Sequence, residues 1–143
     1  MSSQGRRLQD WPTRLAMFLA EGDQAPFVWG SRDCCTAACD LVERMTGLDP
    51  MAELRGQYDS PLSAARVLGP GGLATTVEEL ASVAGFVRVP VLTAQRGDLV
   101  LVMVDDAPAL GFVDLAGRIT VPAQPRGWRT FPLRSGLRAW RVD

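Results

Sequence analysis

The fold class is decided by the apolar stretch "LVLVMV", residues 99–104. A strand with one face in water alternates apolar and polar residues, whereas a strand covered on both faces needs no polar positions. This uninterrupted apolar run therefore predicts the central strand of a sheet that is buried on both sides.

Short apolar segments accompany this stretch through the second half of the chain. They are rich in β-branched and aromatic residues and are separated by Gly, Pro or Asp, which is typical of strands joined by turns. The expected strands cover residues 86–89, 99–104, 109–115, 118–121, 128–133 and 137–142.

The first half of the chain has helical spacing instead. Pro12 fits the first turn of a helix whose apolar face continues to Gly22. Three further helices are expected from Ser31–Asp33 to Gly47, from Ser60 to the "GPGG" of residues 69–72, and from the capping-box pair Thr76 and Glu79 to Gly85.

Helices followed by strands predict an α+β protein, with N-terminal helices packed on a C-terminal antiparallel sheet of five or six strands. The length suits one domain over residues 1–143, helical over 11–85 and β-rich over 86–142. We find no repeat and no linker between these two parts.

The composition excludes several classes of protein. No run approaches the roughly 18 apolar residues of a membrane span, and residues 1–10 contain no apolar signal segment, so we expect a soluble protein made in the cytoplasm. A net charge of −1 argues against a dedicated nucleic-acid binder. Cys34, Cys35 and Cys39 are too few and too crowded for a disulfide framework, which favours a reducing compartment.

The charge is unevenly distributed along the chain. Acidic residues outnumber arginines in residues 1–106, whereas arginines outnumber acidic residues in 107–143. One hypothesis is an acidic helical side and a basic sheet side, the latter carrying Arg129, Arg138 and Arg141, that contact different partners.

The candidate reactive group lies in "PFVWGSRDCCTAACDLV", residues 26–42. A cysteine at a helix N-terminus faces unpaired N–H groups and the positive end of the helix dipole, and both favour the thiolate. Gly30 supplies a tight turn and Asp33 a cap, so Cys34 stands at that position. The alternative is that the three cysteines are small, buried and unreactive residues of an Ala-rich helix. The local pattern leaves both interpretations open.

The segment "PFVWGSRDCC" (26–35), followed by an amphipathic helix, resembles the nucleophile motif of NlpC-type cysteine peptidases, papain-like enzymes that cut cell-wall peptides. The resemblance implies a papain-like fold with the nucleophile position at Cys34. The family's Gly-Asp pair before an apolar strand is similar to "RGDLVLV" (96–102). Its next strand opens with His-Val-Gly-Ile, where the His is the general base. The matching residues here are "ALGF" (109–112), so Ala109 occupies the position of the histidine.

Further segments resemble one branch of that superfamily, small proteins of uncharacterised function encoded among tail genes of phages, prophages and phage-like elements. These segments are Trp11-x-x-Arg14-Leu15, "TGLDP" (46–50), "RGQY" (55–58), "RVLGPGG" (66–72), "ALGF" (109–112) and "AWRV" (139–142). The branch implies a place in the tail tip or in its assembly, with other tail proteins as partners, and no established reaction.

The chain contains no histidine at all. A free thiol with a pKa near 8.5 is only slightly ionised at neutral pH, and a positioned base typically contributes about 10² to 10⁴-fold to the rate. Amide cleavage also needs a proton for the leaving amine. Loss of the base therefore predicts a domain that has lost most of its peptidase activity.

A carboxylate is the remaining candidate for the base. Asp33 adjoins the thiol, and Asp105, Asp106 and Asp114 lie around the strand that should face it. An Asp with a pKa near 3.9 matches a thiol poorly unless it is deeply buried. Asp105 and Asp106 are better interpreted as a solvated turn. Asp114 interrupts an apolar strand and is the better candidate, although an outward-facing strand residue also fits.

Other functional interpretations have less support. Cys35 and Cys39 lie one helical turn apart, but a structural zinc site needs four ligands, so we expect no metal and no cofactor. "RGD" (96–98) before an apolar strand is interpreted as a turn. Three tryptophans are expected to anchor the core or an interface, the alternative being a groove for a sugar or peptide. They are Trp29, Trp128 and Trp140.

Three hypotheses for function follow. The first is a structural or assembly component of a phage or phage-like tail, located in the particle and built on a degenerate peptidase domain. The second is an active cysteine peptidoglycan hydrolase or thiol acyltransferase that takes its base from a partner, the substrate or a buried Asp. The third is an assembly chaperone that is absent from the finished particle.

Overall fold

The computed structural model describes residues 6–69 and 71–143. Residues 1–5 of the expected single domain, and Pro70 of "RVLGPGG", lie outside the described residues. Within the described ranges, no helix is both long enough and apolar enough to cross a membrane.

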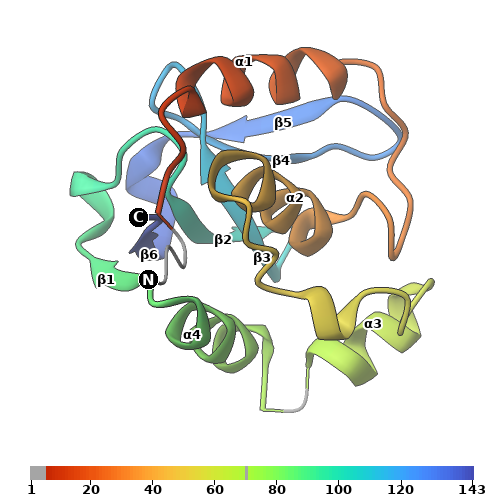
Figure 1. Cartoon of the computed structure of the whole chain (residues 1–143). Coiled ribbons are helices and arrows are strands. Elements are labelled where there is room, and N and C mark those ends of the chain that lie inside the picture. Colours follow the sequence, from red (N-terminus) through yellow and green to blue (C-terminus); the bar gives the residue numbers. More distant parts are fainter. Residues whose placement is uncertain (1–5, 70) are drawn as a thin grey trace.

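Across the described residues, four α-helices precede a six-stranded antiparallel sheet, which confirms the expected α+β class (Figure 1). The helices are α1 (Trp11–Glu21), α2 (Cys34–Thr46), α3 (Pro61–Leu68) and α4 (Leu73–Ala84). The strands are β1 (Val87–Val89), β2 (Leu99–Val104), β3 (Ala107–Val113), β4 (Ile119–Pro122), β5 (Trp128–Phe131) and β6 (Gly136–Arg141). Short 3₁₀ helices are η1 (Ala52–Leu54), η2 (Val91–Thr93) and η3 (Leu133–Ser135).

The sheet has the strand order β1-β6-β2-β3-β4-β5, so β2 is an interior strand. Leu99 and Leu101 of β2 belong to the main core, which also contains residues of all four helices. Val100 and Val102 belong to a second cluster on the other face, which residues of η2 and η3 help to cover. Both faces of β2 are therefore buried over its first four residues, as the apolar sequence predicts, whereas Met103 near the end of the strand is exposed.

The starts of two helices agree with the sequence. Asp33 and Ser60 cap α2 and α3 by accepting hydrogen bonds from backbone N–H groups in the first turn. The expected start of the fourth helix at Thr76 is wrong, because α4 begins at Leu73 after Gly72. Thr76 lies inside the helix, and its hydroxyl donates to the carbonyl of Leu68 at the end of α3. The Thr76 side chain therefore links α4 to the end of α3 and does not cap the start of α4.

The interpretation of Asp114 as a residue within a strand is also wrong. β3 ends at Val113, and Asp114 organises the turn that follows. One carboxylate oxygen of Asp114 accepts from the backbone N–H groups of Ala116 and Arg118, each at 2.9 Å. The other accepts from the hydroxyl of Thr120 at 3.0 Å. Short polar side chains that bond to nearby backbone N–H groups are typical of such turns.

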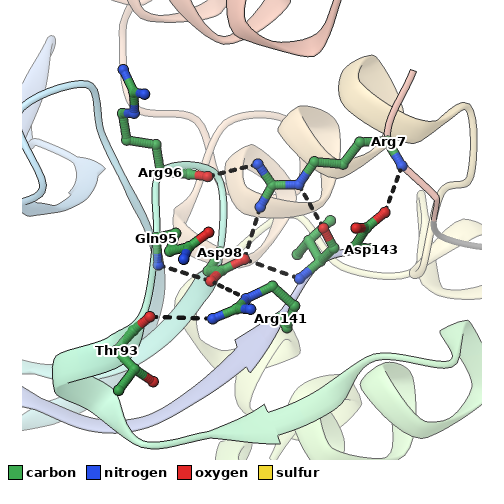
Figure 2. Close-up of polar contacts among 8 residues, drawn as sticks. Arg7, Thr93, Gln95, Arg96, Asp98, Arg141 and Asp143 are labelled. Carbon is green, nitrogen blue, oxygen red and sulfur yellow. Dashed lines mark hydrogen bonds and ion pairs between the residues drawn. The ribbon is translucent and has the colours of Figure 1, made fainter. Parts of the chain in front are cut away.

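A buried carboxylate, Asp98, holds the start of β2 (Figure 2). Its Oδ1 accepts from Arg7 Nη2 at 2.8 Å and from the backbone N–H of Val142 at 3.1 Å. Its Oδ2 accepts from the backbone N–H of Gln95 at 2.8 Å and from Arg141 Nε at 2.9 Å. The "RGD" sequence thus enters the strand through a turn, and its carboxylate is fully engaged inside the protein.

Arg7 links the two ends of the described chain through hydrogen bonds (Figure 2). Its Nε donates to the carbonyl of Val142 at 2.6 Å, and its backbone N–H donates to Asp143 at 3.2 Å. Its Nη1 donates to the carbonyl of Arg96 at 2.7 Å, and the guanidinium lies 4.2 Å from the centroid of the Trp11 ring. Residues 7, 98 and 142 therefore form one connected polar cluster.

The three arginines suggested as a basic contact surface are engaged within the chain. Each makes an ion pair with a carboxylate from a distant part of the sequence. The pairs are Arg129 with Asp105 at 3.1 Å, Arg138 with Glu78 at 3.1 Å, and Arg141 with Asp98 at 2.9 Å. Two of these carboxylates are shared, because Glu78 also pairs with Arg88 and Asp98 also pairs with Arg7. The contact surface stays a hypothesis.

We predict that Asp98→Asn lowers the free energy of unfolding by about 3–5 kcal/mol, because it leaves two arginines beside a neutral, buried side chain. Urea denaturation monitored by circular dichroism measures the change. The matched control is Asp106→Asn, an exposed position at which the same substitution should change stability by less than about 0.5 kcal/mol. Equal stability of the two variants would contradict the role assigned to Asp98.

Candidate functional site

The site is built around the first turn of α2, which Asp33 initiates. Asp33 Oδ1 accepts from the backbone N–H of Thr36 at 3.0 Å, and the hydroxyl of Thr36 accepts from the backbone N–H of Asp33 at 2.8 Å. This reciprocal capping box fixes the helix start. Cys34 consequently occupies the first position of the helix, where the sequence predicts it.

Two further donors hold the Asp33 carboxylate. The backbone N–H of Gly30 donates to Oδ2 at 2.8 Å, and the hydroxyl of Tyr58 donates to Oδ1 at 3.1 Å. Gly30 has a φ of +88°, and a Cβ at this residue would lie 2.2 Å from the carbonyl oxygen of Tyr58. Only glycine fits this turn without displacing the neighbouring chain.

Cys34 and Ala109 line the same cavity, which has a volume of about 380 Å³. Ala109 belongs to β3, where it pairs with Val102 of β2. The remaining wall comes from the segment before α2, from α3 and α4, and from the β2–β3 and β4–β5 connections. Representative residues from these parts are Trp29, Leu68, Leu73, Val104, Pro122 and Gln124. We call this space the Cys34 cavity.

The electrostatics of the cavity oppose ionisation of the thiol. Burial raises the pKa of Cys34 to about 12, and the negative charge of Asp33 adds to the effect. These two effects outweigh the favourable backbone N–H groups at the start of the helix. Cys34 is therefore a neutral thiol at pH 7, although its side chain is only partly buried.

None of the four candidate carboxylates is a free base beside the sulfur. Asp33 already accepts three hydrogen bonds, and Asp114 does not line the cavity. Asp105 and Asp106 form the exposed two-residue turn between β2 and β3, which confirms their interpretation as a turn. Asp105 lies at the rim of the cavity and pairs with Arg129.

The other two cysteines are buried in the core. A hydrogen bond to Cys35 and burial both raise the pKa of the Cys39 thiol. Within residues 6–69 and 71–143, no three His, Cys, Asp or Glu side chains are arranged to hold a metal ion. These thiols have the environment of packed core residues.

All three tryptophans pack in or against the main core. Trp140 is buried in the main core, and its indole N–H donates to Glu78 at 3.0 Å. Trp128 packs on Phe18 and donates to the carbonyl of Leu19 at 2.9 Å. Both confirm the expected anchoring role. Trp29 also packs against the main core and in addition lines the Cys34 cavity.

Several residues of the site lie in segments that the sequence analysis names, but no pattern placed them beside Cys34. Tyr58 reaches Asp33 across 25 positions, and Leu68 and Leu73 reach the cavity from α3 and α4. The pair of Arg129 and Asp105 joins residues 24 positions apart. Such long-range contacts depend on how the helices pack, which local patterns do not specify.

Together these features define an α+β domain in which a helix N-terminus presents a cysteine to a largely apolar cavity. The chain belongs to the family described as Domain of unknown function (DUF6950), whose model matches residues 6–142. None of the curated proteins compared with the chain matches it.

We predict that alkylation of Cys34 by iodoacetamide accelerates by about tenfold per pH unit from pH 7 to 10 without levelling off, because the thiolate fraction rises throughout that range. Mass spectrometry of the labelled peptide measures the rate at each pH. Cys34→Ser controls for labelling of the two buried cysteines. A plateau at or below the ordinary thiol pKa near 8.5 would show an activated sulfur and contradict the prediction.

Proposed function

We propose that this protein is a structural or assembly component of the tail of a phage or phage-like particle, built on a papain-like, NlpC-type peptidase domain that has lost its catalytic base. The proposal combines the sequence resemblance with one observation. Cys34 and Ala109, which match the nucleophile and histidine positions of that family, face one cavity. No imidazole exists in the chain to replace the missing base.

The chemistry of the cavity supports a binding role over hydrolysis. Thiol peptidases need a thiolate and an acid that protonates the leaving amine. Here the pKa of Cys34 is raised to about 12, and the adjacent carboxylate of Asp33 is engaged by three donors. In this proposal the former active-site face contacts other tail proteins.

An active peptidoglycan hydrolase is the second candidate. It is favoured by the partial accessibility of Cys34, which keeps a thiol at the wall of an open cavity. This function requires a base from a partner chain or from the substrate. Such a base would have to lower the pKa of the thiol by several units, because burial and Asp33 both raise it.

The decisive experiment compares particles and activity for the unmodified chain and Cys34→Ala. We expect mass spectrometry to detect the protein in purified particles, and both forms to support normal assembly, because the thiol has no chemical role. We also expect neither form to digest peptidoglycan. Digestion that is lost in Cys34→Ala would establish the hydrolase instead, and absence of the protein from finished particles would favour an assembly chaperone.

We predict that Ala109→His partly restores thiol reactivity. An imidazole on β3 facing the cavity would accept the proton of Cys34, so acylation by p-nitrophenyl acetate at pH 7 should accelerate by roughly 10²–10⁴-fold. Release of p-nitrophenol, with Cys34→Ala in the same background, measures the effect.

The matched control is Ala116→His, which places the same side chain in an exposed turn outside the cavity. It should react no faster than the unmodified chain. A folded Ala109→His protein with unchanged reactivity would show that residue 109 does not stand over the thiol as the resemblance implies.

A further inference from the structure

A second hollow in the surface lies where four parts of the chain meet. Trp11 begins α1, Arg96 precedes β2, Leu115 belongs to the β3–β4 turn, and Leu133 belongs to η3. Among the described residues, this hollow shares none with the Cys34 cavity. Its volume of about 460 Å³ lies within the range of about 300–1,000 Å³ that is typical of ligand sites. We call it the Arg96 groove.

Arg96 carries the one charged side chain of the groove wall among the described residues. Its backbone carbonyl accepts from Arg7 Nη1 at 2.7 Å. Its guanidinium points away from that contact and makes no ion pair within residues 6–69 and 71–143 (Figure 2). The groove therefore presents a cation whose charge no carboxylate of the described chain neutralises.

The two carboxylates that adjoin the groove in the sequence are engaged elsewhere. Asp98 is buried and already paired with two arginines. Asp114 is held in its own turn by three hydrogen bonds. The groove wall itself contains no acidic side chain among the described residues, whereas the wall of the Cys34 cavity contains Asp33. An anion entering the Arg96 groove would thus meet a cation and no anion of the wall.

The rest of the groove wall is mainly apolar. Trp11, Val113, Leu115 and Leu133 supply aromatic and aliphatic surface. The Arg7 guanidinium lies 4.2 Å from the centroid of the Trp11 ring, and this contact helps to fix the ring in the wall. A single guanidinium can donate two parallel hydrogen bonds to one carboxylate. The apolar side chains would cover the group that carries this carboxylate.

We infer that the Arg96 groove binds a carboxylate attached to an apolar group, as in the C-terminal residue of a peptide or in a free aliphatic acid. Arg96 holds the carboxylate, and Leu115 and Leu133 cover the apolar part. Inorganic phosphate fits less well, because it could use the guanidinium but would gain nothing from the apolar wall. This site is independent of Cys34 and of the proposed tail role.

The test titrates the ¹⁵N-labelled full chain with N-acetyl-leucine, which has a free carboxylate, and with N-acetyl-leucinamide, its uncharged counterpart. We expect saturable NMR shifts of the Arg96 and Gly117 amides and of the Trp11 indole. N-acetyl-leucine should bind at least about threefold more tightly than the amide. This preference should disappear in about 0.5 M NaCl, because salt screens an exposed ion pair.

Three further ligands identify what the groove recognises. Acetyl-Gly-Gly-Leu offers the same terminal residue on a peptide, and hexanoate is a free aliphatic acid. Both should shift the same signals. Tighter binding of the peptide would assign the carboxylate to a chain end, and tighter binding of hexanoate would assign it to a free acid. Inorganic phosphate should bind more weakly than either.

Two variants separate the contributions of charge and apolar surface. Arg96→Gln should reduce the affinity for N-acetyl-leucine to that for the amide and leave the amide unaffected. Leu115→Ala should weaken both leucine probes by about two- to threefold. The matched control is Arg66→Gln, which removes an exposed arginine of α3 that lies outside the groove and also forms no ion pair among the described residues. It should change neither affinity.

The salt dependence is measured on the unmodified chain, so it serves even if a variant does not fold. Equal affinity for the acid and the amide, shifts confined to other surfaces, or no saturable binding overturns the inference. An Arg96→Gln protein that keeps the preference for the acid also overturns it, as does phosphate binding as tight as that of N-acetyl-leucine. The tail role is measured separately, by mass spectrometry of particles.

Discussion

The rest of the structure depends on the burial of the Asp98 carboxylate between two arginines. This side chain joins the residues before α1, the start of β2 and the end of β6 through four hydrogen bonds. Since β2 is the strand on which β3 and β6 both align, fixing its start also fixes their register. The position of Ala109 opposite Val102 follows from that register. A charge remote from the Cys34 cavity thus helps to position the strand whose Ala109 lines that cavity.

A second carboxylate, Asp33, has two opposite effects on the candidate site. It begins α2 and holds Gly30 and Tyr58, so it places Cys34 at the helix N-terminus where a reactive thiol would stand. The same negative charge adds to burial in raising the pKa of that thiol. In an enzyme, a nearby cation formed by the base would offset this effect. The thiol therefore lies at a helix N-terminus and has a raised pKa, which supports the proposed contact role over hydrolysis.

Local patterns in the sequence predicted most of the secondary structure, whereas Ala109 was named only through the family resemblance; Cys34 and Ala109 line one cavity. The buried β2 strand, the caps of α2 and α3 and the α+β order all follow from patterns within a few residues. The error at Thr76 arose because a capping-box pattern can also lie inside a helix, where this Thr donates to Leu68. The error at Asp114 arose because an apolar run does not show where a strand gives way to a turn. The cavity wall from α3 and α4, and the partners of Asp98, come from distant segments. No local rule predicts them, because they depend on how the elements pack.

The junction of the two described chain ends at Asp98 also affects how the protein would respond to a pulling force. Arg7 contacts both Val142 and Asp143, so the first and last described segments lie side by side (Figure 1, Figure 2). Tension applied between those segments would act on these hydrogen bonds and ion pairs before it reached the paired strands of the sheet. The hydrogen bonds and ion pairs around Asp98 would therefore resist such a force first, and the core would be loaded only after they break.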